Sequence, residues 1–247
     1  MLGSAPDAVR VKDWNLEVFS STVAINNAWQ LTDDWNYLVF PEDLPENRLP
    51  PDESLLNKQL ITAREFVPEQ NHFGGFIYAG GTMAFTAGYW ALGALKPDVI
   101  AYLGCDMIYS MPPGDQSHFY GEGQADPLRK DITLQSLEAK SVRFMAIAQM
   151  NNCSVVNLSD LAESRLLFPR VPIEQFSLKQ NLADFSATFP VDLNANLVDK
   201  ALSVENALGY MVSSGRYWEH TKDFDAEKLS AIDSLWLDAV SEDVETK

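Results

Sequence analysis

The chain is poor in cysteine, histidine and basic side chains. Its 247 residues include only 2 cysteines and 3 histidines, and 18 Lys and Arg stand against 35 Asp and Glu. The formal net charge of −17 argues against a broad basic surface for nucleic acid or anionic membrane. A nucleotide is not excluded, because its phosphates need only a few backbone N–H groups and a helix N-terminus.

Several familiar signals are also missing. No apolar run reaches about 18 residues, so we expect no transmembrane helix, and the first residues lack the basic and apolar regions of a signal peptide. There is no Walker A motif, no Gly-x-Ser-x-Gly elbow and no internal repeat. Cys105 and Cys153 lie in apolar, strand-like segments, which predicts buried, reduced thiols and a cytoplasmic protein.

What is present is an alternation of apolar runs and helical patterns, with 46% hydrophobic residues. Strands are expected at 22–26, 35–40, 76–79, 99–103 and 153–157, and helices at 54–66, 83–95 and 132–150. The continuous apolar run 99–103 is typical of a central parallel strand that is covered on both faces. The alternation predicts an α/β fold with a doubly wound, mostly parallel sheet.

After residue 172 the pattern changes to helices only, at about 173–182, 195–213 and 226–240. We therefore expect a nucleotide-binding α/β domain over 1–172 and a helical C-terminal lobe over 173–247 packed on it. Residues 2–7 look like the end of a first strand, so this strand is either a stub or begins further upstream. The oligomeric state is left open, and a homo-oligomer is compatible with the sequence.

Small and polar residues follow two of the expected turns. Gly3 and Ser4 could cradle a phosphate, or they form an ordinary turn. Gly80 and Gly81 break the chain before Thr82, the expected N-cap of the next helix. Free backbone N–H groups at a helix start can bind an anion, but a tight turn with close packing explains the same residues.

The loop after the strand at 99–103 carries the candidate chemistry. Asp106 could accept a hydrogen bond from a sugar hydroxyl or cap the turn, and the phenol of Tyr109 could donate to a departing phosphate. His118 lies in a polar loop, where an imidazole can transfer protons near neutral pH or simply serve structure. Asp106, His118 and Asp126 match no strong ligand spacing, so we expect no metal. Four arginines could contact an anionic ligand or form surface ion pairs: Arg129, Arg143, Arg165 and Arg170.

In this order, these motifs resemble the bacterial lipooligosaccharide sialyltransferases and a wider related set. That set includes archaeal hydroxymethylpterin pyrophosphokinases and flagellin-modification (motility) accessory factors. The resemblance covers roughly residues 2–170. It rests on five segments: Gly3-Ser4-Ala5-Pro6-Asp7, Val23-Ala24-Ile25-Asn26-Asn27, Gly80-Gly81-Thr82, Gly104-Cys105-Asp106-Met107-Ile108-Tyr109 and Ser117-His118-Phe119-Tyr120-Gly121.

The resemblance implies a Rossmann-like, nucleotide-sugar-dependent glycosyltransferase that uses a CMP-linked donor, a glycan or small-molecule acceptor, and neither metal nor cofactor. His118 would be the general base and Tyr109 the partner of the departing phosphate. The residues implied for donor binding are Gly3, Ser4, Asn26, Gly81, Thr82 and Asp106.

Two departures keep alternatives open. Ser4-Ala5 replaces the more glycine-rich loop of the sialyltransferases, and Glu42-Asp43 follow a strand where those enzymes have a polar Asn. The acids are closer to the pterin pyrophosphokinase-like set, so one alternative is phosphotransfer with Mg²⁺ and ATP held near Asp43 and Asp106. The other alternative is a non-catalytic ligand-binding protein of the same fold.

Overall fold

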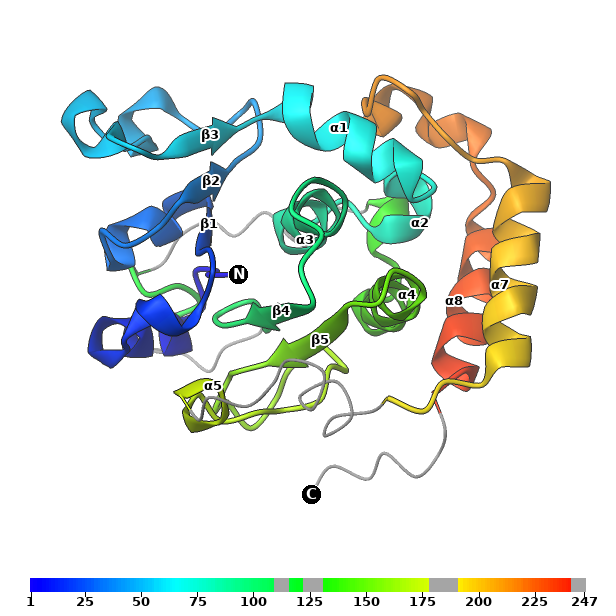
Figure 1. Ribbon diagram of the computed structural model, residues 1–247. Coiled ribbons are helices and arrows are strands. Elements are labelled where there is room, and N and C mark those ends of the chain that lie inside the picture. Colours follow the sequence, from blue (N-terminus) through cyan, green and yellow to red (C-terminus); the bar gives the residue numbers. More distant parts are fainter. Residues whose placement is uncertain (109–115, 122–130, 178–190, 241–247) are drawn as a thin grey trace.

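The computed structural model describes residues 1–108, 116–121, 131–177 and 191–240. Its strands are short and parallel (Figure 1). One sheet has the order β1 (Val23–Ile25), β2 (Tyr37–Val39) and β3 (Gln59–Ile61), and β4 (Val99–Tyr102) pairs with β5 (Ser154–Asn157). The expectation of an α/β protein with parallel strands is confirmed at this level.

Leu2 joins the two sheets. It forms parallel bridges to Ala24, in β1, and to Leu103, directly after β4. The Leu2 N–H donates to the Val23 carbonyl at 2.8 Å, and the Gly3 N–H donates to the Leu103 carbonyl at 2.8 Å. The strand order across the molecule is therefore β3, β2, β1, Leu2, β4, β5, with the first strand at its centre.

Side chains of adjacent strand residues enter different cores, because a strand alternates its faces. Ile100 and Tyr102 belong to one hydrophobic cluster, whereas Leu103 belongs to another. The first core is covered by α3 (Met83–Ala94) and α4 (Leu137–Met150), and the second by η1 (Pro6–Asp13) and η3 (Asn26–Leu31) (Figure 1). The sheet is thus covered on both faces, as the apolar run 99–103 predicts.

Two expected elements were wrong. The helix expected at 54–66 is instead the end of η5 (Asp52–Leu55), β3, and the start of α1 (Ala63–His72). Glu65 accepts hydrogen bonds from the N–H and hydroxyl of Thr62 at 2.9 and 2.8 Å. This capping interaction places the start of α1 after residues 59–61, which pair with β2.

The second error concerns 76–79, where a strand was expected. This run is a short buried helix, α2 (Phe76–Ala79), that lies between Gly75 (φ 82°) and Gly80 (φ 87°). A short apolar run fits a buried helix or a buried strand equally well, so periodicity could not separate them.

The remaining elements follow the expected pattern more closely. Thr82 caps α3 by accepting from the Phe85 N–H at 3.4 Å, and Ser136 caps α4 by accepting from the Ala139 N–H at 3.1 Å. The described short helices also include η2 (Leu16–Val18), η4 (Glu46–Arg48), η6 (Ile132–Leu134) and α5 (Glu174–Ser177). Cys105 and Cys153 are free, buried thiols, as expected, and burial raises the pKa of each to about 12.

The C-terminal helices are anchored on α4 through buried charges. They are α7 (Ala195–Leu208), η7 (Tyr217–Asp223) and α8 (Ala226–Asp238), and α7 and α8 lie outside α4 (Figure 1). The Arg143 guanidinium donates to Glu205 of α7 at 2.8 Å, and Lys140 Nζ lies 2.6 Å from Asp233 of α8. Their apolar residues belong to the same core as α3 and α4, so the lobe is packed on the α/β part.

Glu205 supplies the counter-charge for the buried guanidinium of Arg143. Arg143 also donates to the Tyr89 hydroxyl at 2.7 Å and to the Phe73 carbonyl at 2.8 Å, while Trp236 Nε1 donates to Glu205 at 2.9 Å. Both charged side chains are at most 5% exposed. No helix in the described part of the chain is long and apolar enough to cross a membrane.

Glu205→Gln should lower the free energy of unfolding by about 3 to 5 kcal/mol, because it leaves the Arg143 charge buried without a counter-charge. The matched control is Glu219→Gln, which breaks an exposed pair with Arg216 at 3.7 Å and should cost less than about 1 kcal/mol. Urea unfolding measures both values. Equal losses would show that the buried pair does not anchor the lobe.

Candidate functional site

The predicted site residues gather at one edge of the molecule. Strands β1 to β5 of the described residues are parallel, so their carboxyl ends lie at the same edge. Helices α3 and α4 lead directly back to the starts of β4 and β5, so their N-termini lie at that edge as well. The residues that this topology brings there are Gly3, Ser4, Asn26, Gly81, Thr82 and Asp106.

Gly3 and Gly104 are required by a close approach of two chain segments. A Cβ atom on Gly3 would lie 2.2 Å from the Gly104 carbonyl oxygen. Gly104 has φ 71°, and a Cβ there would lie 2.5 Å from the Cβ of Ala8. The first strand end and the β4 end therefore pack backbone against backbone, which explains both glycines without a ligand.

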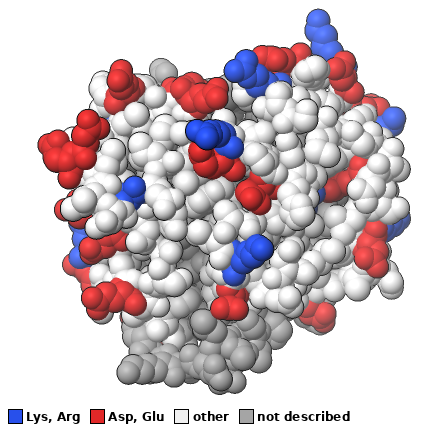
Figure 2. Space-filling model, turned by 45° about the horizontal axis from the view of Figure 1, so that its top comes forward, with Lys and Arg blue, Asp and Glu red and all other residues white. Residues whose placement is uncertain are grey.

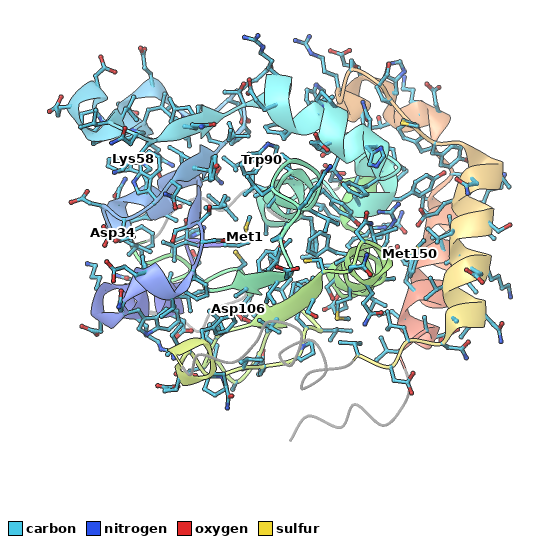
Figure 3. All side chains as sticks on the ribbon, in the orientation of Figure 1. Met1, Asp34, Lys58, Trp90, Asp106 and Met150 are labelled. Carbon is cyan, nitrogen blue, oxygen red and sulfur yellow. The ribbon has the colours of Figure 1, made fainter. Side chains whose placement is uncertain are left out.

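Asp106 carries an acceptor that no described residue uses. Its side chain is buried, with 1% of the residue exposed, and Figure 3 shows it between β4 and β5. Asn157, at the end of β5, donates to Asp106 Oδ1 at 3.4 Å, but Oδ2 has no hydrogen-bond partner among the described residues. A buried acceptor without a donor is costly, so this oxygen is suited to a hydroxyl or amino group of a ligand.

Two further buried acceptors without a described partner follow β1. Asn26 has φ 53°, a left-handed conformation that Asn tolerates better than most residues. The Oδ1 atoms of Asn26 and Asn27 are both buried and have no hydrogen-bond partner in the part of the chain that the structure describes. Asn27 was not predicted as a site residue, although two successive Asn residues after a buried strand are a usable signal.

His118 lies beside the first strand end. The Phe119 N–H donates to the Ser4 carbonyl at 3.0 Å, which fixes the neighbouring His118 next to the Gly3–Ser4 segment. The ring is half-buried, its Nδ1 lies 2.8 Å from Ser117 Oγ, and its centroid is 5.0 Å from that of Tyr120. If Nδ1 carries the proton and donates to Ser117, Nε2 is left as an acceptor.

The surroundings of His118 favour its neutral form. Burial lowers its pKa below the usual 6.5, and the charge of Arg48 lowers it further. Arg48 lies in η4, in the loop after β2, and its carbonyl accepts from Trp29 Nε1 at 3.0 Å. A neutral imidazole at pH 7 can accept a proton. Arg48 was missed by the sequence analysis, because only the fold brings residues 48 and 118 near each other.

At the Gly80–Thr82 turn, a backbone N–H that could bind an anion is hydrogen-bonded within the protein. The Gly81 N–H, expected to hold the donor, donates instead to Thr133 Oγ1 at 3.0 Å. Thr82 is the N-cap of α3, as expected. The turn therefore shapes this part of the edge, while the Gly81 amide is already engaged.

The other predicted residues fall elsewhere. Tyr109, Asp126 and Arg129 lie outside the described residues. Arg143 is buried against Glu205, not on the surface, and Arg165 approaches Glu138 at 4.0 Å. Arg170 donates to carbonyls of the loop after β5, at Ser159, Leu161 and Ala162. No group of three or more His, Cys, Asp or Glu that could hold a metal occurs within the described ranges.

Two hollows lie at the opposite edge, where the strands begin. One, of about 220 Å³, is lined by residues that include Thr22 and Val99. The other, of about 590 Å³, includes Asp34 and Lys58, both labelled in Figure 3. The first hollow also reaches Leu103 and Leu158, but neither lining includes Asn26, Asn27 or Asp106, so we place the candidate site by its chemistry and not by its depth.

The surface charge agrees with a small, local site. On the face drawn in Figure 2, Lys and Arg are scattered singly among Asp and Glu and form no broad basic patch.

Comparison with protein-family models, curated proteins and solved structures found no match to this chain. Its function is therefore inferred from the residues at the carboxyl edge.

Gly104→Ala should destabilise the protein more than Gly121→Ala. Both glycines have positive φ, 71° and 109°, but a Cβ on Gly121 meets no atom within 4 Å. We expect about 1 kcal/mol for the strained backbone at Gly121 and about 1 to 3 kcal/mol more at Gly104 for the overlap with Ala8. Thermal unfolding of the two variants measures the difference. Similar losses of stability would argue against the close packing of Gly104 on Ala8.

His118 should titrate below the usual 6.5, and Arg48→Gln should raise its pKa part of the way back. Removing the guanidinium removes the repulsion of the imidazolium, while the larger contribution of burial stays. With only three histidines in the chain, an NMR titration of the ring protons resolves each one. Arg64→Gln, which changes another arginine with an exposed side chain, should leave the His118 curve unmoved.

Proposed function

We propose that the fold is a Rossmann-like, doubly wound sheet whose site is a nucleotide-sugar-dependent glycosyltransferase site. The strand order supports the fold proposal. From Leu2 the chain proceeds to β1, β2 and β3 on one side, while β4 and β5 lie on the other. A doubly wound sheet binds its ligand where the strand order reverses in this way. The reversal lies between Leu2 and β4, next to Gly3 and Gly104.

The chain segments that follow these two strands diverge. Residues of η1, after Leu2, pack in the second core, while η6 and α4, after β4, pack in or against the first. In doubly wound sheets, divergence to opposite faces is the arrangement that places the ligand just outside the two strand ends. A CMP-linked donor placed there would lie between the first loop and the end of β4.

The unused acceptors are suited to the nucleoside part of such a donor. Asp106 Oδ2 and the Oδ1 atoms of Asn26 and Asn27 are buried acceptors without donors among the described residues. Ribose hydroxyls and an exocyclic amino group supply donors, and pairing removes the penalty of a buried unsatisfied oxygen. Arg48 supplies positive charge near His118, where it favours a nearby anionic group.

His118 is the proposed general base. Its neutral Nε2 would take the proton from an acceptor hydroxyl as that oxygen bonds to the anomeric carbon of the sugar. The bond between the sugar and the phosphate oxygen breaks in the same reaction, and the nucleotide leaves with that electron pair. Tyr109, nine residues before His118 in the sequence, is the expected donor to the departing phosphate.

The observation that carries the proposal is the Phe119 N–H bond to the Ser4 carbonyl, 3.0 Å long. It holds an imidazole with a lowered pKa beside the strand ends that carry unused buried acceptors.

The direct test is a panel of CMP-, UDP- and GDP-sugars and ATP, with product formation followed with and without chelator. Turnover of a CMP-sugar in the presence of chelator supports the proposal. ATP turnover that stops with chelator would replace it by phosphotransfer. A nucleotide-induced rise in melting temperature without any turnover would replace it by a ligand-binding role.

His118→Ala should reduce turnover of the donor by about 100- to 10,000-fold, the usual contribution of a general base, and leave nucleotide affinity nearly unchanged. His220→Ala is the matched control, because His220 is exposed and contacts Asp223 in the C-terminal lobe. Steady-state kinetics and calorimetric titration with CMP measure the two effects. Equal loss of turnover and affinity would reassign His118 to binding or to structure.

A further inference from the structure

Asp131 organises a hydrogen-bond network at the start of α3. Its Oδ1 accepts from the Thr133 N–H at 2.8 Å and from the Thr133 hydroxyl at 2.7 Å. The same hydroxyl oxygen accepts from the Gly81 N–H at 3.0 Å. The carboxylate therefore orients the hydroxyl that holds the Gly80–Thr82 turn.

The other oxygen of Asp131 reaches the C-terminal lobe. The Tyr217 hydroxyl, from η7, donates to Asp131 Oδ2 at 2.8 Å. Tyr217 is buried, and its ring stacks on Phe76 with centroids 5.9 Å apart. A Cβ atom on Gly81 would lie 2.1 Å from the Tyr217 hydroxyl oxygen, so the turn and the lobe are in direct contact.

We propose that Tyr217 and Asp131 are positioning residues for the candidate site, so that the C-terminal lobe sets the geometry of the turn before α3. This inference rests on the proposed function for its meaning in catalysis. The network spans three parts of the chain: the turn at 80–82, the segment 131–133 and η7. One buried pair of α4 lies close to this turn, because a Cβ atom on Gly80 would lie 3.1 Å from Cγ of Lys140, which pairs with Asp233.

The hydrogen bonds of Asp131 fix the orientation of its carboxylate, which apolar packing alone does not do. A carboxylate that accepts three hydrogen bonds is held in one orientation, and hydrogen bonds to an ionised group are the stronger kind. The ring of Tyr217 packs on Phe76, and its hydroxyl donates to Asp131. Removing the hydroxyl therefore separates positioning from packing.

The first experiment measures amide hydrogen exchange at Gly81, which needs no ligand. Tyr217→Phe should speed this exchange by about tenfold, the size expected for loss of one hydrogen bond to a charged group. Tyr210→Phe is the matched control, because Tyr210 also lies in the lobe, stacks on Tyr78 and accepts one hydrogen bond, from the Asp225 N–H at 3.3 Å. It should leave Gly81 unchanged.

The second pair of variants tests Thr133. Thr133→Val removes the hydroxyl at nearly constant volume and should speed Gly81 exchange as Tyr217→Phe does, whereas Thr133→Ser keeps the hydroxyl and should restore slow exchange. Unaltered exchange in both Tyr217→Phe and Thr133→Val would overturn the positioning role, whether or not the variants keep their melting temperatures.

Nucleotide titration then links the network to function. If the wild type binds CMP, Tyr217→Phe and Thr133→Val should weaken binding or lower kcat by about tenfold, while Tyr210→Phe and Thr133→Ser should not. Wild-type affinity and kcat in all four variants would overturn the inference and leave the proposed function standing. If the wild type binds no nucleotide but Gly81 exchange responds, the proposed function fails and the structural link stands.

Discussion

The pairing of Leu2 with two neighbours is the constraint on which the rest of the structure depends. One residue bridges to both Ala24 and Leu103, and so joins two short sheets into a single run of parallel strands. For this the strand ends must approach closely, which only Gly3 and Gly104 allow. The segments that follow these two strand ends pack on opposite faces of the sheet, η1 in the second core and α4 in the first. Polar groups can therefore converge between them.

At that edge several oxygens have no partner in the described part of the chain, whereas other groups are used by the protein's own structure. Asp106 Oδ2 and the Asn26 and Asn27 oxygens have no hydrogen bond among the described residues, whereas the Gly81 amide is engaged by Thr133. Buried unsatisfied acceptors are costly in folded proteins. Those of Asn26, Asn27 and Asp106 follow β1 and β4, and others lie on Gln70, Asn71 and Asp233, away from the strand ends. This contrast separates groups suited to a ligand from groups that shape the site.

The C-terminal lobe is tied to the α/β part in two different ways. Glu205 and Asp233 neutralise buried cations of α4, which fixes the position of α7 and α8. Tyr217 contacts the turn before α3 through Asp131. A lobe that looks like an appendage from its helical sequence is therefore joined both to the core and to the edge that holds His118.

The sequence by itself determined the features that local signals control. The strand within 99–103, the Thr82 cap and the burial of both thiols follow from neighbouring residues, and the loop position of His118 follows from its polar context. The helix expected over 132–150 begins instead at Leu137, after the cap Ser136. Tertiary structure alone decided that 59–61 is a strand, that Arg143 is buried, and that Arg48 influences His118. These outcomes depend on partners 22 to 70 residues away, whose approach no local pattern encodes. Pairing with β2 outweighed the helical pattern of 54–66 for this reason.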